Sequence, residues 1–204
     1  NAVAELALAL LFSCARNISI AGHTMRENKW EKKAYSKGFE LAGKTMGVVG
    51  YGRIGRLVGE KGQALGMNVL SYVNRHKPEG CECETMHFVT QDEMFAQSDI
   101  IVLCAPGAGK PIVDAESLAR MKDGVVIINV SRGANVDEAA LLEALNSGKV
   151  KAAGLDVWMS EKDPNWALAQ HPAVSCTPHI GADTKEAQKR IGAELVDIIE
   201  HFEA

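Results

Sequence analysis

The chain has 204 residues, of which 47% are hydrophobic and 24% are charged, enough for one large globular domain or two small ones. Its formal net charge of -4 and pI near 5.9, without a long run of one sign, argue against nucleic acid or an anionic membrane as a partner. These numbers favour a small-molecule partner.

The five cysteines are an odd number without a CxxC pair, which indicates free thiols in a reducing compartment, so we expect a cytoplasmic protein. Cys81 and Cys83 form a CxC pair close to two histidines. That spacing is not one of the usual zinc patterns, and we expect no metal site.

The first predicted element is an N-terminal helix, "NAVAELALALLFSCAR", which is apolar around its whole circumference apart from Glu5. It lacks a basic segment in front and is shorter than the ~20 apolar residues of a membrane helix, so we expect a helix buried in an interface. Residues 21–39 are mixed in charge without clear periodicity. They predict a surface excursion anchored by Trp30 and Phe39.

From residue 44 onward, strand and helix patterns alternate. Continuous Val/Ile runs between helices predict strands covered on both faces, and therefore an α/β fold with a doubly wound parallel sheet, the Rossmann fold. Asp114 and Asp137 are predicted helix caps, and Asp183 with Glu186 predicts a capping box for the last helix. Strands are predicted at 44–50, 67–73, 87–89, 99–106, 124–131, 150–158 and 173–178, and helices at 53–66, 91–98, 115–121, 138–148 and 184–202.

The stretch "GYGRIG" places Gly50, Gly52 and Gly55 between a predicted strand and a predicted helix. In that context the first glycine allows a tight turn, the second lets the backbone approach a pyrophosphate, and the third lets helix and strand pack closely. The helix start at Arg53 and Ile54 offers free amides and a positive dipole end to phosphates. The turn therefore predicts a dinucleotide site, with a ligand-free structural turn as the alternative.

Polar residues follow three later strands. Arg132 comes directly after a buried strand, Asp156 ends another with Glu161 beyond it, and His179 precedes the last helix. Each has an ordinary alternative: a surface ion pair, a solvated loop acid or a turn histidine. Because ligands bind at the carboxyl ends of parallel strands, these side chains can share one crevice. A cation, a histidine and an acid suit hydride transfer at an alcohol carbon.

At these residues the chain resembles the D-isomer-specific 2-hydroxyacid dehydrogenases, through "AVAELALALL", "GYGRIGRLV", "INVSRGANVDEAAL", "AAGLDVW" and "TPHIGADTKEAQ". The resemblance implies that Arg132 binds the substrate carboxylate and keto oxygen, that His179 exchanges the hydroxyl proton, and that Glu161 holds His179. It also implies that Asp156 hydrogen-bonds the nicotinamide carboxamide. Further cofactor contacts are implied for Ala105 and Pro106 on the adenine side and for Val130, Ser131 and Gly181 on the nicotinamide side.

The resemblance also implies a domain organisation. Residues 1–204 would be the dinucleotide-binding domain, with an interdomain helix and dimer excursion at 1–40, a Rossmann core at 41–182 and a returning helix at 183–204. The substrate domain would lie outside this chain, and the partner would be a second copy in a homodimer. Two features depart from the family pattern: Lys162 stands where proline is usual, and the loop at 105–114 is shortened.

The end of the second predicted strand bears on the choice of cofactor. NAD enzymes normally place a carboxylate there to bind the ribose hydroxyls, whereas this sequence has Val73, Asn74 and Arg75. Asn74 can bond a ribose, and Arg75 can pair with a 2'-phosphate. The sequence therefore predicts NAD or NADP with relaxed selectivity, while a solvated basic loop with NAD preferred is the alternative.

The resemblance implies hydride transfer to or from a 2-hydroxy or 2-keto acid, and the last motif is most similar to the phosphoglycerate dehydrogenase branch. A glyoxylate or hydroxypyruvate reductase and a nucleotide-sensing corepressor of the same fold are alternatives. A Rossmann methyltransferase would have no use for the Arg, Glu and His set.

Overall fold

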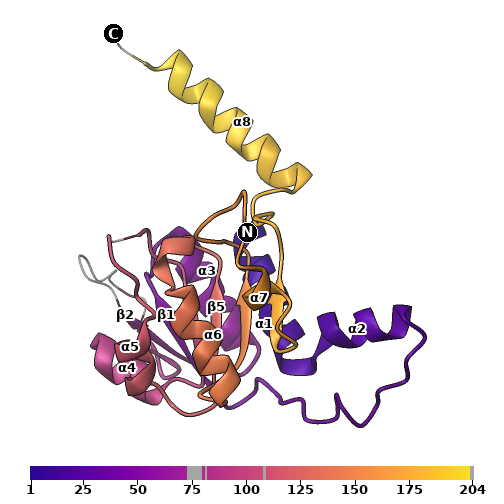
Figure 1. Ribbon diagram of the computed structural model, residues 1–204. Helices are drawn as coiled ribbons and strands as arrows, with labels where there is room; N and C mark the ends of the chain where they lie inside the picture. The colour runs from indigo at the N-terminus through magenta and orange to yellow at the C-terminus, as the bar shows by residue number, and fades with distance from the viewer. Residues whose placement is uncertain (73–79, 81, 108, 203–204) are drawn as a thin grey trace.

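A computed structural model describes residues 1–72, 80, 82–107 and 109–202 (Figure 1). Its centre is a seven-stranded sheet whose paired strands are all parallel, in the order β3-β2-β1-β4-β5-β6-β7. The predicted doubly wound α/β fold is confirmed. The strands are β1 (Thr45–Val49), β2 (Asn68–Tyr72), β3 (Met86–Phe88), β4 (Ile100–Leu103), β5 (Val125–Asn129), β6 (Val150–Leu155) and β7 (Val174–Cys176).

Helices cover both faces of the sheet. The first and third pack on one face, and the fourth to seventh on the other, so every residue of β4 and β5 is buried. This two-sided cover explains why those strands read as continuous apolar runs. The helices are α1 (Ala2–Arg16), α2 (Ile18–Arg26), α3 (Arg53–Ala64), α4 (Gln91–Gln97), α5 (Ala115–Arg120), α6 (Glu138–Ser147), α7 (Trp166–Ala169) and α8 (Lys185–Glu200), with a 3-10 turn, η1 (Gly133–Asn135), before α6.

The helix caps agree with the sequence at two of three predicted positions. The Asp114 carboxylate accepts from the Ser117 amide at 2.8 Å, and Asp137 accepts from two amides of α6. The prediction that Asp183 and Glu186 cap the last helix is wrong. The cap is Thr184, whose hydroxyl accepts from the Ala187 amide at 3.1 Å, because the helix begins one residue later than the pattern indicated.

The N-terminal helix is buried within this chain. It packs against β5, β6, β7 and α3, and Leu10 and Leu11 are among its buried residues. Most of the apolar surface of this helix is therefore covered by other elements of the same chain, while Phe12 remains 38% exposed. Of the helices described, none alone has the length and apolar character to cross a membrane, and α1 and α2 meet the criteria only as a pair bent by 69°.

Residues 17–40 include the surface excursion that the sequence predicted at 21–39, with two differences. The segment begins with a helix of nine residues, α2, which was not predicted and none of whose residues is buried. Trp30 is 78% exposed and does not anchor the segment. Phe39 does: its amide donates to the Ala15 carbonyl at 3.0 Å, and the Lys151 ammonium lies 4.6 Å from the centre of its ring.

The last helix, α8, projects away from the body of the molecule (Figure 1). Ala187 is its buried residue, and apolar side chains such as Leu195 and Ile199 are 53% and 72% exposed.

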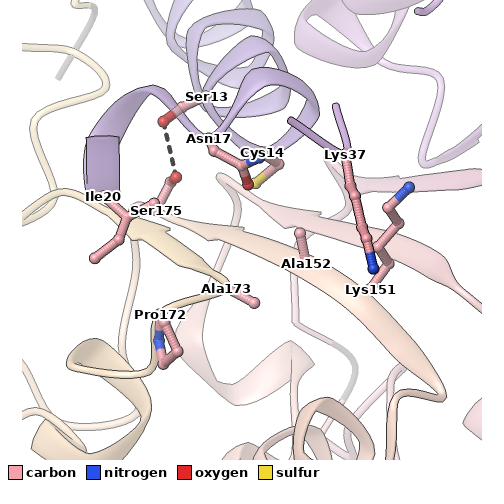
Figure 2. Close-up of a pocket in the computed structure, with 10 residues that line it drawn as sticks. All are labelled: Ser13, Cys14, Asn17, Ile20, Lys37, Lys151, Ala152, Pro172, Ala173 and Ser175. Atoms are coloured by element: carbon pink, nitrogen blue, oxygen red, sulfur yellow. Dashed lines mark hydrogen bonds between the residues drawn. The ribbon is translucent and has the colours of Figure 1, made fainter. Parts of the chain in front are cut away.

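A small hollow of about 50 Å³ lies between the end of α1, the start of α2 and the strands β6 and β7 (Figure 2). The hydroxyls of Ser13 and Ser175 meet there at 2.8 Å, and Lys37 and Lys151 border it. None of the predicted site residues lines this hollow.

Candidate functional site

The glycine turn connects β1 to α3 at the centre of the sheet, where the strand order reverses between β1 and β4. Ligands of open parallel sheets bind outside the carboxyl ends of the strands at this kind of position. Gly50 has φ +89°, and a Cβ on it would lie 2.8 Å from Ala105 Cα. A Cβ on Gly55 would lie 2.0 Å from the Gly50 carbonyl oxygen. Both glycines are required by the fold itself.

Gly52 differs from those two glycines. Its φ is -80°, which any residue can adopt, and a Cβ there would meet no protein atom within 4 Å. The fold therefore does not need glycine at this position, whereas a ligand lying against the backbone does. A pyrophosphate fits this cradle.

The start of α3 supplies the donors for such a ligand. Gly52 is the N-cap and provides no side-chain cap, and the first bond of the helix runs from the Arg56 amide to the Gly52 carbonyl at 2.9 Å. The amides of Arg53, Ile54 and Gly55 precede that bond, at the positive end of the helix dipole. This is the arrangement in which helix starts bind phosphate groups.

The ends of the neighbouring strands lie beside the glycine turn. Ala105 and Pro106 follow β4, and Val130 and Ser131 follow β5, so all four lie at the same edge as the glycine turn. Burial raises the pKa of the nearby Cys104 thiol to about 12, and the thiol therefore packs as a small protonated group. Val73, Asn74 and Arg75 lie outside the described residues.

The loop that carries Arg132 is shaped by the buried side chain of Asn129. Its amide nitrogen donates to the Arg132 carbonyl at 2.9 Å, and its oxygen accepts from the amide and hydroxyl of Ser131. The Arg132 guanidinium donates to the Ser131 carbonyl at 2.7 Å and is exposed at the crevice edge. An exposed guanidinium with free donors is suited to a carboxylate.

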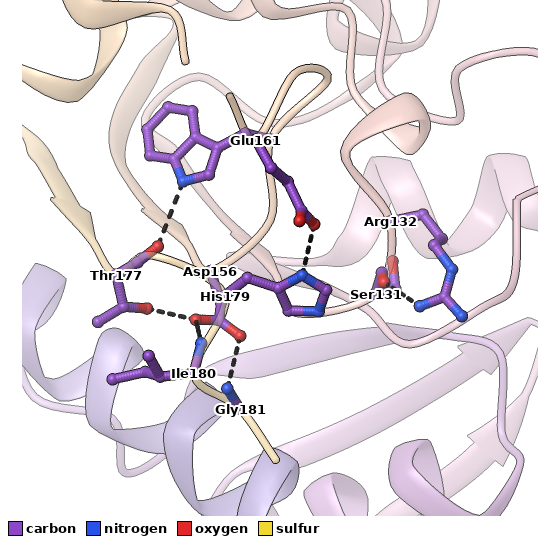
Figure 3. A network of polar contacts seen from close by, with 9 residues as sticks. Ser131, Arg132, Asp156, Glu161, Thr177, His179, Ile180 and Gly181 are labelled. Atoms are coloured by element: carbon purple, nitrogen blue, oxygen red, sulfur yellow. Dashed lines mark hydrogen bonds and ion pairs between the residues drawn. The ribbon is translucent and has the colours of Figure 1, made fainter. Parts of the chain in front are cut away.

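His179 and Glu161, which are separated by 18 residues in the sequence, meet in space. His179 Nδ1 lies 2.5 Å from Glu161 Oε1. Figure 3 shows the imidazole directed toward the loop of Ser131 and Arg132, with Glu161 on its other nitrogen. The side chains are 47% and 60% exposed, so the pair faces the solvent of an open cleft.

Asp156 fixes the segment that carries His179. The aspartate is 1% exposed and accepts from the Thr177 hydroxyl at 2.6 Å and from the Ile180 and Gly181 amides at 2.9 Å each (Figure 3). His179 lies between these partners with φ +57°, an uncommon conformation for a residue other than glycine. The carboxylate therefore holds the histidine in a strained turn, in addition to any contact with a cofactor.

The loop that carries Glu161 packs against the segment that follows Arg132. The Met159 amide donates to Glu138 Oε1 at 2.8 Å, and a Cβ on Gly133 would lie 2.0 Å from the carbonyl carbon and oxygen of Trp158. The arginine loop and the acid loop thus pack backbone to backbone. Sequence reasoning missed Asn129, Gly133 and Glu138, because nothing in their local pattern indicates which distant loop they touch.

A cavity of about 300 Å³ adjoins the His179–Glu161 pair. The Trp158 indole, which forms part of its wall, donates to the Thr177 carbonyl at 3.2 Å. Its remaining lining is mostly apolar and comprises Pro164, Trp166, Ala169, Cys176, Thr177 and Pro178. Burial also raises the pKa of Cys176. In the part of the chain that the structure describes, no group of three or more His, Cys, Asp or Glu residues could hold a metal ion.

Comparison with known proteins places the whole fold in one family. Residues 8–181 match the model for the D-isomer specific 2-hydroxyacid dehydrogenase, NAD binding domain. The chain is 46% identical to a hydroxypyruvate reductase of Thermotoga maritima over 97% of this chain and 65% of the relative. It is 39% identical to a D-3-phosphoglycerate dehydrogenase of Mycobacterium tuberculosis over 98% of this chain and 38% of the relative.

Solved structures agree with these relatives. A glyoxylate reductase from Paecilomyes thermophila superposes with a TM-score of 0.91 at 37% identity, over 98% of this chain and 61% of that one. A D-lactate dehydrogenase from Aquifex aeolicus, solved with NAD and lactic acid, has a TM-score of 0.87 at 32% identity, over 98% and 65%. The chain thus spans less than two thirds of the length of these relatives.

Proposed function

Because this chain belongs to the D-isomer specific 2-hydroxyacid dehydrogenase family and spans its NAD-binding domain, we propose that it hosts hydride transfer between a nicotinamide cofactor and a D-2-hydroxy acid. The observation that carries the proposal is the pairing of His179 with Glu161 at the same sheet edge as the glycine turn and Arg132. A protein that binds no ligand would have no need of a histidine, an acid and an arginine beside a glycine turn.

In the proposed reaction, the cofactor supplies or accepts a hydride at the nicotinamide ring. Arg132 binds the substrate carboxylate and polarises the keto oxygen. His179 exchanges the hydroxyl proton through Nε2, because Nδ1 is engaged by Glu161. Glu161 orients the imidazole and balances its charge when it is protonated.

We assign the cofactor contacts to the glycine turn and the neighbouring strand ends. Gly50, Gly52, Arg53, Ile54 and Gly55 would hold the pyrophosphate. The remaining contacts would come from Ala105, Pro106, Val130, Ser131, Asp156 and Gly181, and from Val73, Asn74 and Arg75 at the ribose. Since no carboxylate stands at that last position, we propose that NADP(H) binds as well, within about tenfold of NAD(H), or roughly 1.4 kcal/mol.

For the substrate we propose 3-phosphoglycerate, as in serine biosynthesis, on the similarity of "TPHIGADTKEAQ" to that branch. A hydroxypyruvate or glyoxylate reductase is a second candidate, favoured by the 46% identity to the Thermotoga maritima hydroxypyruvate reductase. A corepressor-like nucleotide sensor of the same fold would bind cofactor without turnover. The longer relatives support a substrate domain beyond this chain, connected through residues 1–40 and 183–204 to the core at 41–182.

We further propose that the protein acts as a homodimer in the cytoplasm. The unburied helix α2, in which Met25 is 54% exposed, and Trp30 beyond its end, which is 78% exposed, support a contact between copies. The free thiols Cys14, Cys83, Cys104 and Cys176 support a reducing compartment.

Cofactor binding is the direct test. Titration calorimetry of this chain should detect NADH and NADPH, and Gly52→Val should abolish both signals. The unfolding temperature should change little, because a Cβ at this position meets no protein atom within 4 Å. Gly192→Val, on the exposed helix α8, is the matched control and should bind normally. Undiminished binding by Gly52→Val would overturn the assignment of the turn.

The same preparation tests how much of the active site the chain contains. Without the proposed substrate domain, the cleft has one wall, so water is not excluded and Arg132 alone binds the substrate carboxylate. Oxidation of 3-phosphoglycerate by this chain should therefore be slow. Rapid steady-state turnover by these 204 residues would contradict the proposed second domain.

A further inference from the structure

Asn135, at the end of η1, is 0% exposed and holds together two loops of the candidate site. Its side-chain nitrogen donates to the Ala105 carbonyl at 3.0 Å and to the Ser131 hydroxyl at 2.9 Å. Ala105 follows β4 and Ser131 follows β5. One amide group thus connects the two strand ends that border the proposed cofactor crevice.

The main chain of Asn135 strengthens the same connection. Its carbonyl accepts from the amides of Ile112 and Val113 at 2.8 and 3.0 Å. The residue therefore binds the segment that follows β4 both near its start, at Ala105, and near its end, at Ile112 and Val113. No other described side chain is hydrogen-bonded to Ala105.

The orientation of the amide has a cost. A backbone carbonyl only accepts hydrogen bonds, so the nitrogen must face Ala105, and the oxygen must point the other way. That oxygen is buried without a partner among the described residues, on the side of Gly107. A buried acceptor without a donor lowers stability, and this loss offsets part of what the two hydrogen bonds of the nitrogen contribute. What the amide group specifically provides is the connection between the two strand ends.

The hydrogen bonds continue from Asn135 to the main chain of Arg132, the residue proposed to bind the substrate carboxylate. The Ser131 hydroxyl donates to Asn129 Oδ1 at 2.9 Å, and the Asn129 amide donates to the Arg132 carbonyl at 2.9 Å. An unbroken chain of hydrogen bonds therefore runs from Ala105, through Asn135, Ser131 and Asn129, to Arg132.

We propose that Asn135 is a positioning residue that fixes the β4 wall of the cofactor crevice relative to the Ser131–Arg132 loop, so that cofactor affinity depends on a side chain that does not touch the cofactor. This inference rests on the proposed function. It assigns to Asn135 a role in ligand binding that is separable from its effect on stability.

The test is Asn135→Leu in the 204-residue chain, with NADH affinity measured by calorimetry and stability by thermal unfolding. We expect the unfolding temperature to fall, because the Ala105 carbonyl and the Ser131 hydroxyl lose their donor. Measured well below that temperature, where the variant is folded, the dissociation constant for NADH should increase at least fivefold. Asn146→Leu, an exposed asparagine on α6, is the matched control and should change neither quantity.

Ser131→Ala removes the middle of the hydrogen-bonded chain with little change in volume, and Asn135→Ala replaces the leucine variant if that variant does not fold. Because Ser131 is itself a proposed cofactor contact, the informative quantity is the coupling between the two positions. The loss of NADH affinity caused by the Asn135 substitution should be at most half as large, in logarithm, in the Ser131→Ala background. Unchanged affinity in the folded Asn135 variant, or a loss of full size in the Ser131→Ala background, would overturn the inference. Absence of NADH binding by the unsubstituted chain would instead overturn the proposed function.

Discussion

Gly133 shows how individual residues fix the geometry of the candidate site. Its α-carbon faces the carbonyl of Trp158 so closely that a Cβ would lie 2.0 Å from two backbone atoms and 2.5 Å from the Met159 amide. Arg132 precedes this glycine, and Glu161 follows Met159 by two residues. The position of Arg132 relative to Glu161 therefore depends on the absence of a side chain at Gly133.

Gly133→Ala should displace the acid loop, because backbone atoms cannot yield as a flexible side chain can. We expect a loss of about 1–3 kcal/mol in the free energy of unfolding, the usual range for overpacking, together with a change in the His179 imidazole signals in NMR spectra. Gly192→Ala, which meets no atom within 4 Å and lies in α8, is the control and should be neutral or slightly stabilising. Unaltered imidazole signals in Gly133→Ala would show that the two loops are not coupled.

At the scale of elements, the strands and the glycine turn could be predicted because their signals are local. Apolar runs predict strands, and "GYGRIG" has meaning because it follows one strand and opens a helix. The helix α2 was not predicted, because it has only nine residues and follows α1 after the single residue Asn17. The hydrogen bonds of Asn129, Asn135 and Glu138 depend on which loops meet in the folded chain, and no pattern within their own segments contains that information.

The start of α8 provides a test of the corrected cap. Thr184→Ala removes the acceptor for the Ala187 amide and should destabilise the first turn by about 0.5–2 kcal/mol, whereas Asp183→Ala should have little effect. Hydrogen exchange of the α8 amides, followed by mass spectrometry, measures the difference directly, because the helix is exposed and contributes little to global unfolding. Faster exchange in Asp183→Ala than in Thr184→Ala would restore the cap that the sequence indicated.

At the scale of the whole molecule, a well-packed sheet carries two projecting segments, the excursion at 17–40 and the helix α8 (Figure 1). Both segments carry strongly exposed apolar side chains: Trp30 is 78% and Ile199 is 72% exposed. Exposed apolar surface of this kind marks contacts with other chains or domains. We propose that the first segment contacts a second copy of the chain and the second a substrate domain.

Sedimentation tests the first of these assignments. The chain should be dimeric at micromolar concentration, and Trp30→Ala should shift the equilibrium toward monomer by removing apolar contact area. Trp166→Ala, which changes another exposed tryptophan, in α7, is the control and should leave the dimer intact. A monomer at high micromolar concentration would contradict the proposed dimer.

The position of α1 in the fold has a consequence for biosynthesis. This helix packs on β5, β6 and β7, and roughly 100 residues separate its end at Arg16 from the start of β5 at Val125. A ribosome adding about 5–20 residues per second needs on the order of 5–20 s to make that stretch, during which α3, which also packs on α1, is made before any of these three strands. We therefore expect part of the apolar surface of α1 to stay uncovered in the nascent chain until the second half of the sheet emerges. Substitutions that slow pairing of β5 and β6 should therefore lower the yield of folded protein more than they lower the stability of the finished molecule.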